Sequence, residues 1–173
     1  MNYGEIMDRL ILLRHGKAER ESASGGDFAR RLTGRGVRES RDMGRTLAEM
    51  GFIPDVALVS PAARAKGTWE AASPSFPDTA VVLDEALYHA EGGLVRVLAE
   101  KAGRTAGTVM VVGHNPGLQE LTLGLLIEGS AHAALLHRAR AQFPTAAAAV
   151  FLFDAAGRPT SDGLFLPERG GHD

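Results

Sequence analysis

Four consecutive apolar residues, Leu10-Ile11-Leu12-Leu13, end directly at Arg14-His15-Gly16, and this junction constrains the fold more than any other segment. A short apolar run of this kind predicts a buried β-strand. The strand would deliver a cation and an imidazole side by side to the carboxyl edge of a sheet, which is where ligands bind in open α/β sheets. Gly16 predicts a close approach of the backbone to a ligand, because glycine has no side chain in the way.

The same kind of junction recurs twice downstream. The predicted strand 56–59 precedes Ser60-Pro61-Ala62-Ala63-Arg64-Ala65, and the predicted strand 108–112 precedes Gly113-His114-Asn115-Pro116-Gly117. Each junction leads from a strand into a helix and offers an arginine or a histidine. Three such junctions in one chain indicate a single shared site.

Strand and helix signals alternate along the chain, which predicts an α/β fold. We expect three layers, with a central, mostly parallel sheet and helices on both faces. Two further strands are predicted over 80–83 and 147–154, the second a candidate edge strand. Helices are predicted over residues 33–50, 60–72, 94–102, 115–127 and 132–141. Several of them have Ser, Asn, Thr or Pro at their start and Gly at their end, which are typical helix boundaries.

Length and charge narrow the class of protein. The 173 residues predict a single domain, 1–173, with a core over about 9–154 and a flexible tail over 157–173 that is rich in Gly, Pro and charge. The 19 basic and 21 acidic residues give a net charge of −2, so nothing drives the chain toward nucleic acid. The absence of cysteine excludes disulfides, thiolate metal sites and a cysteine nucleophile.

Nothing in the chain predicts export or a membrane span. Charged residues interrupt the apolar residues of 1–13, which is unlike a signal peptide. The longest apolar run, 146–153, is far too short to cross a bilayer. We therefore expect a cytoplasmic protein without a membrane partner, present as a monomer or a weak dimer.

Taken together, the three junctions resemble the motifs of the histidine phosphatase superfamily, which also contains the cofactor-dependent phosphoglycerate mutases. The resemblance covers residues 9–154. Leu13-Arg14-His15-Gly16 resembles the family signature, Ser60-Pro61 with Arg64-Ala65 and Thr68 resembles its second motif, and Gly113-His114-Asn115-Pro116 resembles its second-histidine motif. The short length resembles the compact branch of SixA-like phosphohistidine phosphatases.

The residues at these junctions suit phosphoryl transfer. A neutral imidazole is a competent nucleophile at cellular pH, and a covalent intermediate divides the transfer into two easier steps. We assign His15 as the nucleophile, with the backbone around Gly16 as a candidate acceptor for its other ring nitrogen. Arg14 and Arg64 are suited to bidentate contact with phosphoryl oxygens, and His114 is a second donor to the same group. Taken singly, each of these residues also fits a structural or surface role.

The predicted phosphate-binding set is therefore Arg14, His15, Arg64 and His114, with no metal and no cofactor. His132 and His137 are five residues apart, so they do not share one helical face as metal ligands would.

By resemblance, Glu85 occupies the position of the acid that protonates the leaving oxygen in many family members. The chain departs from the family pattern just after it, where Tyr88-His89-Ala90 replaces a glycine-rich stretch. Asp84 is the competing acid, and a solvated loop carboxylate is the structural alternative. An imidazole leaving group would need no strong acid.

These residues leave several functions open. The first is a phosphatase that acts through phosphohistidine, either on phosphohistidine in a protein partner or on a small phosphate ester. The second is a non-catalytic phosphate-binding module. A mutase is less favoured, because it needs a closed site and the chain has only short loops to build one.

Overall fold

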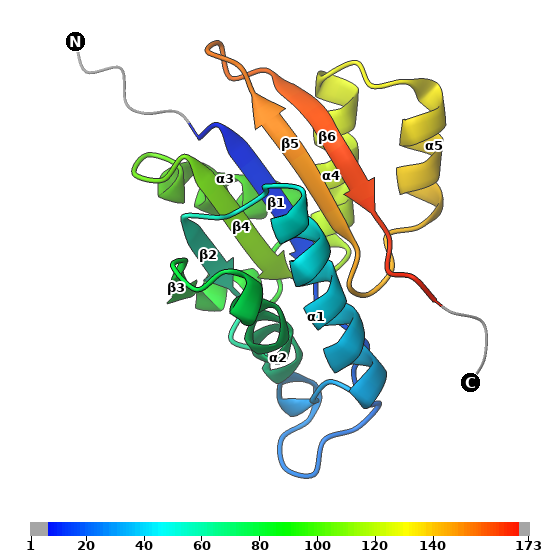
Figure 1. Cartoon of the computed structure of the whole chain (residues 1–173). Coiled ribbons are helices and arrows are strands. Elements are labelled where there is room, and N and C mark those ends of the chain that lie inside the picture. Colours follow the sequence, from blue (N-terminus) through cyan, green and yellow to red (C-terminus); the bar gives the residue numbers. More distant parts are fainter. Residues whose placement is uncertain (1–6, 170–173) are drawn as a thin grey trace.

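Six strands form one sheet in the order β3-β2-β4-β1-β5-β6, in a computed structural model that describes residues 7–169 (Figure 1). The strands are β1 (Arg9–Arg14), β2 (Val56–Val59), β3 (Ala80–Leu83), β4 (Thr108–Gly113), β5 (Ala148–Phe153) and β6 (Pro159–Phe165). Strands β1 to β4 are mutually parallel where they pair, and the pairs of β5 with β1 and with β6 are antiparallel.

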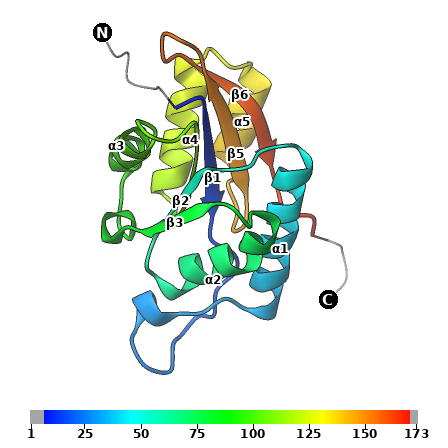
Figure 2. The ribbon, with the colours of Figure 1, turned by 60° about the vertical axis from the view of Figure 1, so that its left-hand side comes forward.

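Helices cover both faces of this sheet (Figures 1 and 2). They are α1 (Gly34–Glu49), α2 (Ala63–Ala72), α3 (Gly92–Ala102), α4 (Gly117–Glu128) and α5 (Ala133–Ala141), with short 3₁₀ turns η1 (Asp27–Ala29), η2 (Ser73–Ser75) and η3 (Glu85–Leu87). Helices α1 and α2 lie on one face, and α3, α4 and α5 lie on the other. The predicted three-layer α/β fold is confirmed.

Alternate residues of the central strands enter the two cores. Ile11 and Leu13 of β1 pack with the residues of α1 and α2, and Leu10 and Leu12 pack on the opposite side with α3, α4 and α5. All four side chains are buried. A strand buried on both faces has to be apolar at every position, which is why β1 and β4 are continuous apolar runs.

Helix α1 has the boundaries that its sequence predicts. The Thr33 hydroxyl accepts a hydrogen bond from the Gly36 amide at 3.0 Å and so caps the first turn. Gly51 follows the helix with φ 80°, a conformation that glycine adopts without steric cost.

The prediction that Ser60 caps α2 is wrong. The helix begins at Ala63, and Ala62 is its N-cap without any side-chain cap. The Ser60 hydroxyl is 3.4 Å from the Ala62 amide and makes a shorter contact with His114 instead.

The carboxyl-terminal part of the sheet also differs from expectation. β5 is not an edge strand, because β1 pairs with one side of it and β6 with the other. β6 lies in the segment 157–173 that we expected to be flexible, of which residues 170–173 are outside the described part. Its sequence, PTSDGLF, contains Pro and Gly and has no apolar alternation, so its extended shape comes from pairing with β5 and not from its own propensity.

Within residues 7–169, no helix combines the length and the apolar character that crossing a membrane would need.

Gly44 of α1 sets the distance between α1 and α2, because a Cβ there would lie 2.9 Å from the Cα and carbonyl oxygen of Ala72. We expect Gly44→Ala to lower the free energy of unfolding by about 1–3 kcal/mol through overpacking. The matched control is Gly124→Ala in α4, where a Cβ would meet nothing within 4 Å. This control should stabilise the protein by about 0.5–1 kcal/mol, the usual gain of Ala over Gly in a helix. Urea unfolding measures both, and equal stability of the two variants would contradict the close helix contact.

Candidate active site

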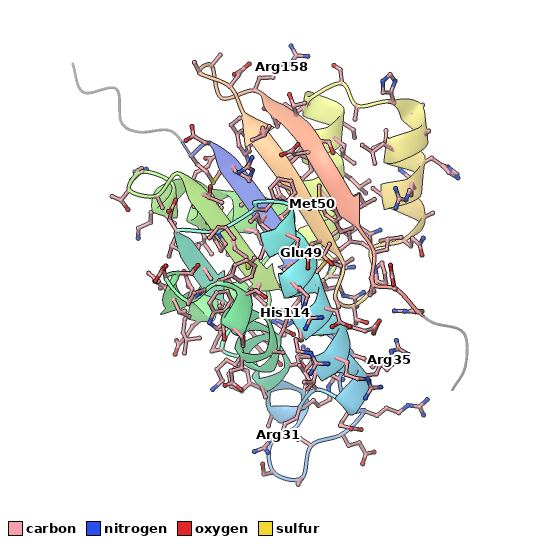
Figure 3. The ribbon with its side chains drawn as sticks, viewed as in Figure 1. Arg31, Arg35, Glu49, Met50, His114 and Arg158 are labelled. Carbon is pink, nitrogen blue, oxygen red and sulfur yellow. The ribbon has the colours of Figure 1, made fainter. Side chains whose placement is uncertain are left out.

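The register of the parallel strands brings the three predicted junctions together. Arg14 at the end of β1 lies opposite Gly113 at the end of β4, so His15 and His114 are the next residues along two neighbouring strands. The His15 amide donates to the Gly113 carbonyl at 3.0 Å, and the Ser60 amide after β2 donates to the Val112 carbonyl at 3.0 Å. The His114 side chain lies near the carboxyl end of β4 (Figure 3). All three junctions therefore meet at one edge of the sheet.

His15 is held in one tautomer by contacts on both ring nitrogens. Nδ1 is 2.8 Å from the carbonyl oxygen of Gly16, and a carbonyl can only accept, so Nδ1 carries the proton. Nε2 is then the acceptor, and Arg64 Nε donates to it at 3.4 Å. The residue is only 8% exposed. The lone pair of Nε2 therefore lies beside the Arg64 guanidinium. The acceptor that we expected for the other ring nitrogen is the carbonyl oxygen of Gly16.

The backbone at Gly16 approaches helix α1, whereas the sequence led us to expect close approach to a ligand. A Cβ at Gly16 would lie 2.6 Å from the Gly36 carbonyl oxygen and 2.6 Å from the Ser40 hydroxyl. The Gly16 amide donates to the Thr68 hydroxyl at 2.9 Å, and that hydroxyl donates to the Arg64 carbonyl at 2.8 Å. This chain of contacts fixes the His15 loop to both α1 and α2.

His114 faces His15 across the site. The two ring centroids are 5.2 Å apart with an angle of 56° between the planes. Nε2 of His114 is 2.7 Å from the Ser60 hydroxyl. Its Nδ1 is buried and has no hydrogen-bond partner among the described residues. The side chain does not cap α4, whose N-cap is Pro116, and its ring lies beside that of His15.

Arg14 is oriented by the segment before β5. Its Nη1 donates to the Phe143 carbonyl at 2.9 Å, and Asn115 Nδ2 donates to the same oxygen at 2.9 Å. The Nε of Arg14 is buried without a partner among residues 7–169. One edge of the guanidinium is therefore fixed while Nε keeps its hydrogen available.

Arg64, in the first turn of α2, has its two outer nitrogens on Asp27. Nη1 donates to the Asp27 carbonyl at 2.8 Å, and Nη2 donates to Asp27 Oδ2 at 3.1 Å. Arg64 is 6% exposed. Each Nη carries two hydrogens, so Arg64 retains donors for an anion while Asp27 holds its plane in place.

Two residues of this site, Asp27 and Tyr88, were not predicted from the sequence. The Tyr88 hydroxyl donates to Asp27 Oδ2, and the Tyr88 ring lies 5.7 Å from the His114 ring and edge-on to Phe28 at 5.0 Å. Asp27 follows two glycines in a polar segment, and nothing in the sequence distinguishes it from other loop carboxylates. The departure from the family pattern at Tyr88 was the one signal that pointed here.

Burial among arginines keeps both histidines neutral. Desolvation, followed by the Arg64 and Arg14 charges, lowers the pKa of His15 from 6.5 to about 4, against the opposing effect of the hydrogen bond to Gly16. Desolvation and then the charges of His15 and Arg64 lower the pKa of His114 to about 3. Burial also lowers the pKa of Arg14, with Arg169 and Arg64 adding to the effect. At neutral pH the site therefore combines two neutral imidazoles with guanidinium cations.

Glu85 does not join these residues. It is exposed at the start of η3, and its side chain makes no hydrogen bond or ion pair within the part of the chain that the structure describes. Asp84 accepts a hydrogen bond from the Ala86 amide at 3.0 Å and so caps η3. The acid role of Glu85 stays a prediction. The same described residues contain no group of three His, Asp or Glu side chains arranged to hold a metal ion.

With this geometry established, the family follows from comparison with known proteins. The family model of the histidine phosphatase superfamily (branch 1) matches residues 10–105, which is more than half of the chain. The chain therefore belongs to the histidine phosphatase superfamily, and the resemblance inferred from its motifs is confirmed.

Solved structures place the chain among SixA-like proteins. A protein of Agrobacterium tumefaciens, provisionally named phosphohistidine phosphatase SixA, is similar with a TM-score of 0.81 and 29% identity, over 93% of this chain and 99% of that one. The protein histidine phosphatase SixA complexed with tungstate is similar with a TM-score of 0.70 and 26% identity, over 90% of this chain and 95% of that one.

A relative of unassigned activity matches over part of its length. An uncharacterised chloroplast protein of Arabidopsis thaliana is 26% identical over 129 residues, which are 66% of this chain. The match spans 57% of the length of that relative.

The low pKa values of the two histidines predict how stability changes with pH. In the unfolded chain both rings regain a pKa near 6.5, so between about pH 4 and 6.5 the unfolded state binds more protons than the folded state. The free energy of unfolding should therefore fall as the pH is lowered through this window. In His15→Asn the free energy of unfolding should fall less steeply with decreasing pH, by about 1 kcal/mol per pH unit, because one group with a lowered pKa has been removed.

Urea unfolding at a series of pH values between 6.5 and 5 measures this slope. The control is His137→Asn, which removes an exposed histidine of α5 and should leave the slope of the parent protein unchanged. A His15→Asn slope equal to that of the parent would show that His15 is not held neutral by burial.

Proposed function

We propose that the protein is a phosphatase that transfers a phosphoryl group first to His15 and then to water, and that its substrate is a phosphohistidine side chain of a partner protein. The observation that carries the proposal is the state of His15: a neutral ring with its proton fixed on Nδ1 by Gly16 and with Nε2 facing Arg64 at 3.4 Å. A nucleophile needs an unprotonated nitrogen, and the lone pair of Nε2 is occupied only by the long hydrogen bond from Arg64 Nε, which an incoming phosphoryl group would displace.

In the first step Nε2 of His15 attacks the phosphorus atom, the Nε2–P bond forms, and the bond from phosphorus to the leaving atom breaks. The leaving atom keeps the electron pair of that bond: an imidazole protonated on its other ring nitrogen leaves as a neutral ring, whereas an alkoxide takes a proton from an acid or from solvent. In the second step water attacks the phosphorus atom and loses a proton to solvent, the P–Nε2 bond breaks, inorganic phosphate leaves, and Nε2 regains its electron pair in neutral His15. The Gly16 carbonyl holds the Nδ1 proton in both steps, so the ring keeps one orientation.

The groups around His15 supply charge stabilisation for the three non-bridging oxygens. Arg64 and Arg14 are the guanidinium donors, and the unpartnered Nε of Arg14 is one N–H that an oxygen would satisfy. The Ser60 hydroxyl at His114 Nε2 can donate or accept, so the contact fits either neutral tautomer, and in each of them one ring nitrogen of His114 carries an N–H. Phosphoryl transfer depends mainly on such positioning and charge neutralisation.

Two considerations favour phosphohistidine as the substrate. An imidazole nitrogen leaves readily, so the reaction does not depend on an acid such as Glu85, whose side chain is exposed and unpaired in the described structure. Of the similar SixA structures, one is provisionally named a phosphohistidine phosphatase and the other is named a protein histidine phosphatase, in complex with tungstate, a tetrahedral oxyanion like phosphate. Hydrolysis of small phosphate esters by the same steps is the alternative substrate class.

Covalent trapping tests the nucleophile. During turnover of a ³²P-labelled phosphohistidine peptide, we expect acid-labile, base-stable label on the protein, because a phosphoramidate on histidine has that stability. His15→Ala should abolish the label, whereas the control His137→Ala, in an exposed histidine of α5, should retain it. Quenched samples separated on gels and treated with acid or base give the readout.

Several outcomes would overturn this assignment. Base-labile label would indicate a serine or carboxylate nucleophile. Binding of phosphate without turnover of the peptide or of a panel of phosphate esters would identify a phosphate-binding module. Each assay is run with and without EDTA, which we expect to leave the rate unchanged, and a loss of rate in EDTA would contradict the metal-independent mechanism.

The acid role predicted for Glu85 has a test of its own. If Glu85 protonates the leaving oxygen, Glu85→Gln should slow hydrolysis of an alkyl phosphate by about 100-fold or more, the typical contribution of general acid catalysis. The same variant should barely slow nitrophenyl phosphate or a phosphohistidine, whose leaving groups need little protonation. The ratio of the two losses in kcat/KM is the measured quantity. Equal losses on both kinds of substrate, or none on either, would exclude Glu85 as the acid.

A further inference from the structure

The Asp27 carboxylate lies at the outer rim of the candidate site. Its side chain is 52% exposed, whereas His15 is 8% exposed. Arg64 connects the two, since its Nε faces His15 Nε2 at 3.4 Å and its Nη2 is 3.1 Å from Asp27 Oδ2. The site therefore extends from a buried nucleophile outward to an exposed carboxylate.

Three side chains fix this carboxylate in place. Arg30 approaches Oδ1 at 2.8 Å, Arg64 approaches Oδ2, and the Tyr88 hydroxyl donates to Oδ2. The Tyr88 ring also lies 5.7 Å from the His114 ring, so the Asp27–Tyr88 pair spans the opening from Arg64 to His114. The hydrogen bond from Tyr88, followed by those from the two arginines, lowers the pKa of Asp27, which keeps the carboxylate ionised at neutral pH.

The direction of phosphoryl transfer decides which part of the substrate meets Asp27. The attacking and leaving atoms lie roughly in line through phosphorus. Because His15 attacks from the buried end of the site, the leaving group departs toward solvent, past the rim formed by Asp27 and Tyr88. The phosphoryl oxygens face the arginines, and the leaving group faces a carboxylate.

We propose that Asp27 is a specificity-determining residue that favours substrates whose leaving group is neutral or cationic and disfavours those whose leaving group carries a negative charge. An imidazole leaving group belongs to the favoured class, and a phosphorylated hydroxy acid, with a carboxylate beside its phosphate, belongs to the disfavoured class. Arg30 and Arg64 carry two positive charges against the one negative charge of Asp27, so the contribution of Asp27 is the change in preference that removal of its carboxylate causes. The inference rests on the proposed function, since it assumes attack by His15.

Three aryl phosphates that differ in the charge of the para substituent test the proposal, and comparing the parent with each variant on the same substrate cancels the differences in leaving-group pKa. They are 4-carboxyphenyl, 4-carbamoylphenyl and 4-(aminomethyl)phenyl phosphate, which present an anion, a neutral amide and a cation at the rim. In Asp27→Asn, kcat/KM for the carboxy compound relative to the carbamoyl compound should rise about fivefold, as expected from removing one charge at a partly exposed position. In the same variant, kcat/KM for the aminomethyl compound relative to the carbamoyl compound should fall by a similar factor. Salt at molar concentration should reduce both changes, because it screens the charges.

Three control variants separate charge from structure. Asp27→Glu restores the carboxylate and should restore the order of the three substrates. Tyr88→Phe removes one hydrogen bond to Asp27 but keeps its charge, so it should keep that order even if all three rates fall. Asp42→Asn removes an equal charge from an exposed position of α1 and should change no ratio.

Binding provides a second readout that needs no turnover. Calorimetry with 4-carboxybenzyl phosphonate and 4-carbamoylbenzyl phosphonate should give a Kd ratio that shifts in Asp27→Asn in the same sense as the rates. A uniform loss on all substrates and ligands in Asp27→Asn would overturn the proposal and leave Asp27 as a residue that only positions Arg64. Charge discrimination in the phosphonates without any phosphohistidine intermediate would instead support the rim effect and reject the proposed nucleophile.

Discussion

The parallel pairing of β1 with β4 is the constraint on which the rest of the site depends. Its register sets Arg14 opposite Gly113, so that His15 and His114 emerge side by side with their rings 5.2 Å apart. A slip of one residue would turn every side chain of β1 to the opposite face, so that each core would receive the side chains that now pack in the other. The apolar packing on both faces of β1 therefore fixes the geometry of the two histidines as well as the stability of the sheet.

Contacts between the His15 loop and helices α1 and α2 then fix the orientation and the tautomer of His15. Thr68 joins the Gly16 amide to the Arg64 carbonyl, and the absence of a side chain at Gly16 lets α1 pack directly against the loop. The loop orients the His15 ring through its own carbonyl, and α2 delivers Arg64 to the other ring nitrogen. The loop and the two helices on this face of the sheet thus determine which ring nitrogen of His15 carries the proton and which one is unprotonated.

The buried part of the site and its exposed rim carry different charged groups. Burial beside arginines lowers the pKa values of His15 and His114, so the interior of the site combines cations with neutral rings. The acidic partner of Arg64 is Asp27, whose side chain is half exposed at the rim. An anionic phosphoryl group suits the interior, while the rim adds one carboxylate, paired with Arg30 and Arg64, beside the position that we propose for the leaving group.

The sequence by itself determined the α/β class, most of the strands and helices, and the three junctions whose residues gather at one edge. These features could be predicted because they depend on local patterns: apolar runs, capping residues and the polar residues that follow each strand. The antiparallel pairing of β5 and the strand β6 could not, because β6 has little propensity of its own and is extended only by its partner. Nor could the roles of Asp27, Tyr88 and the Phe143 carbonyl, which are separated in sequence from the side chains they orient by 28 to 129 positions. Contacts of that range are decided by the packing of complete elements, and only the tertiary structure brings those elements together.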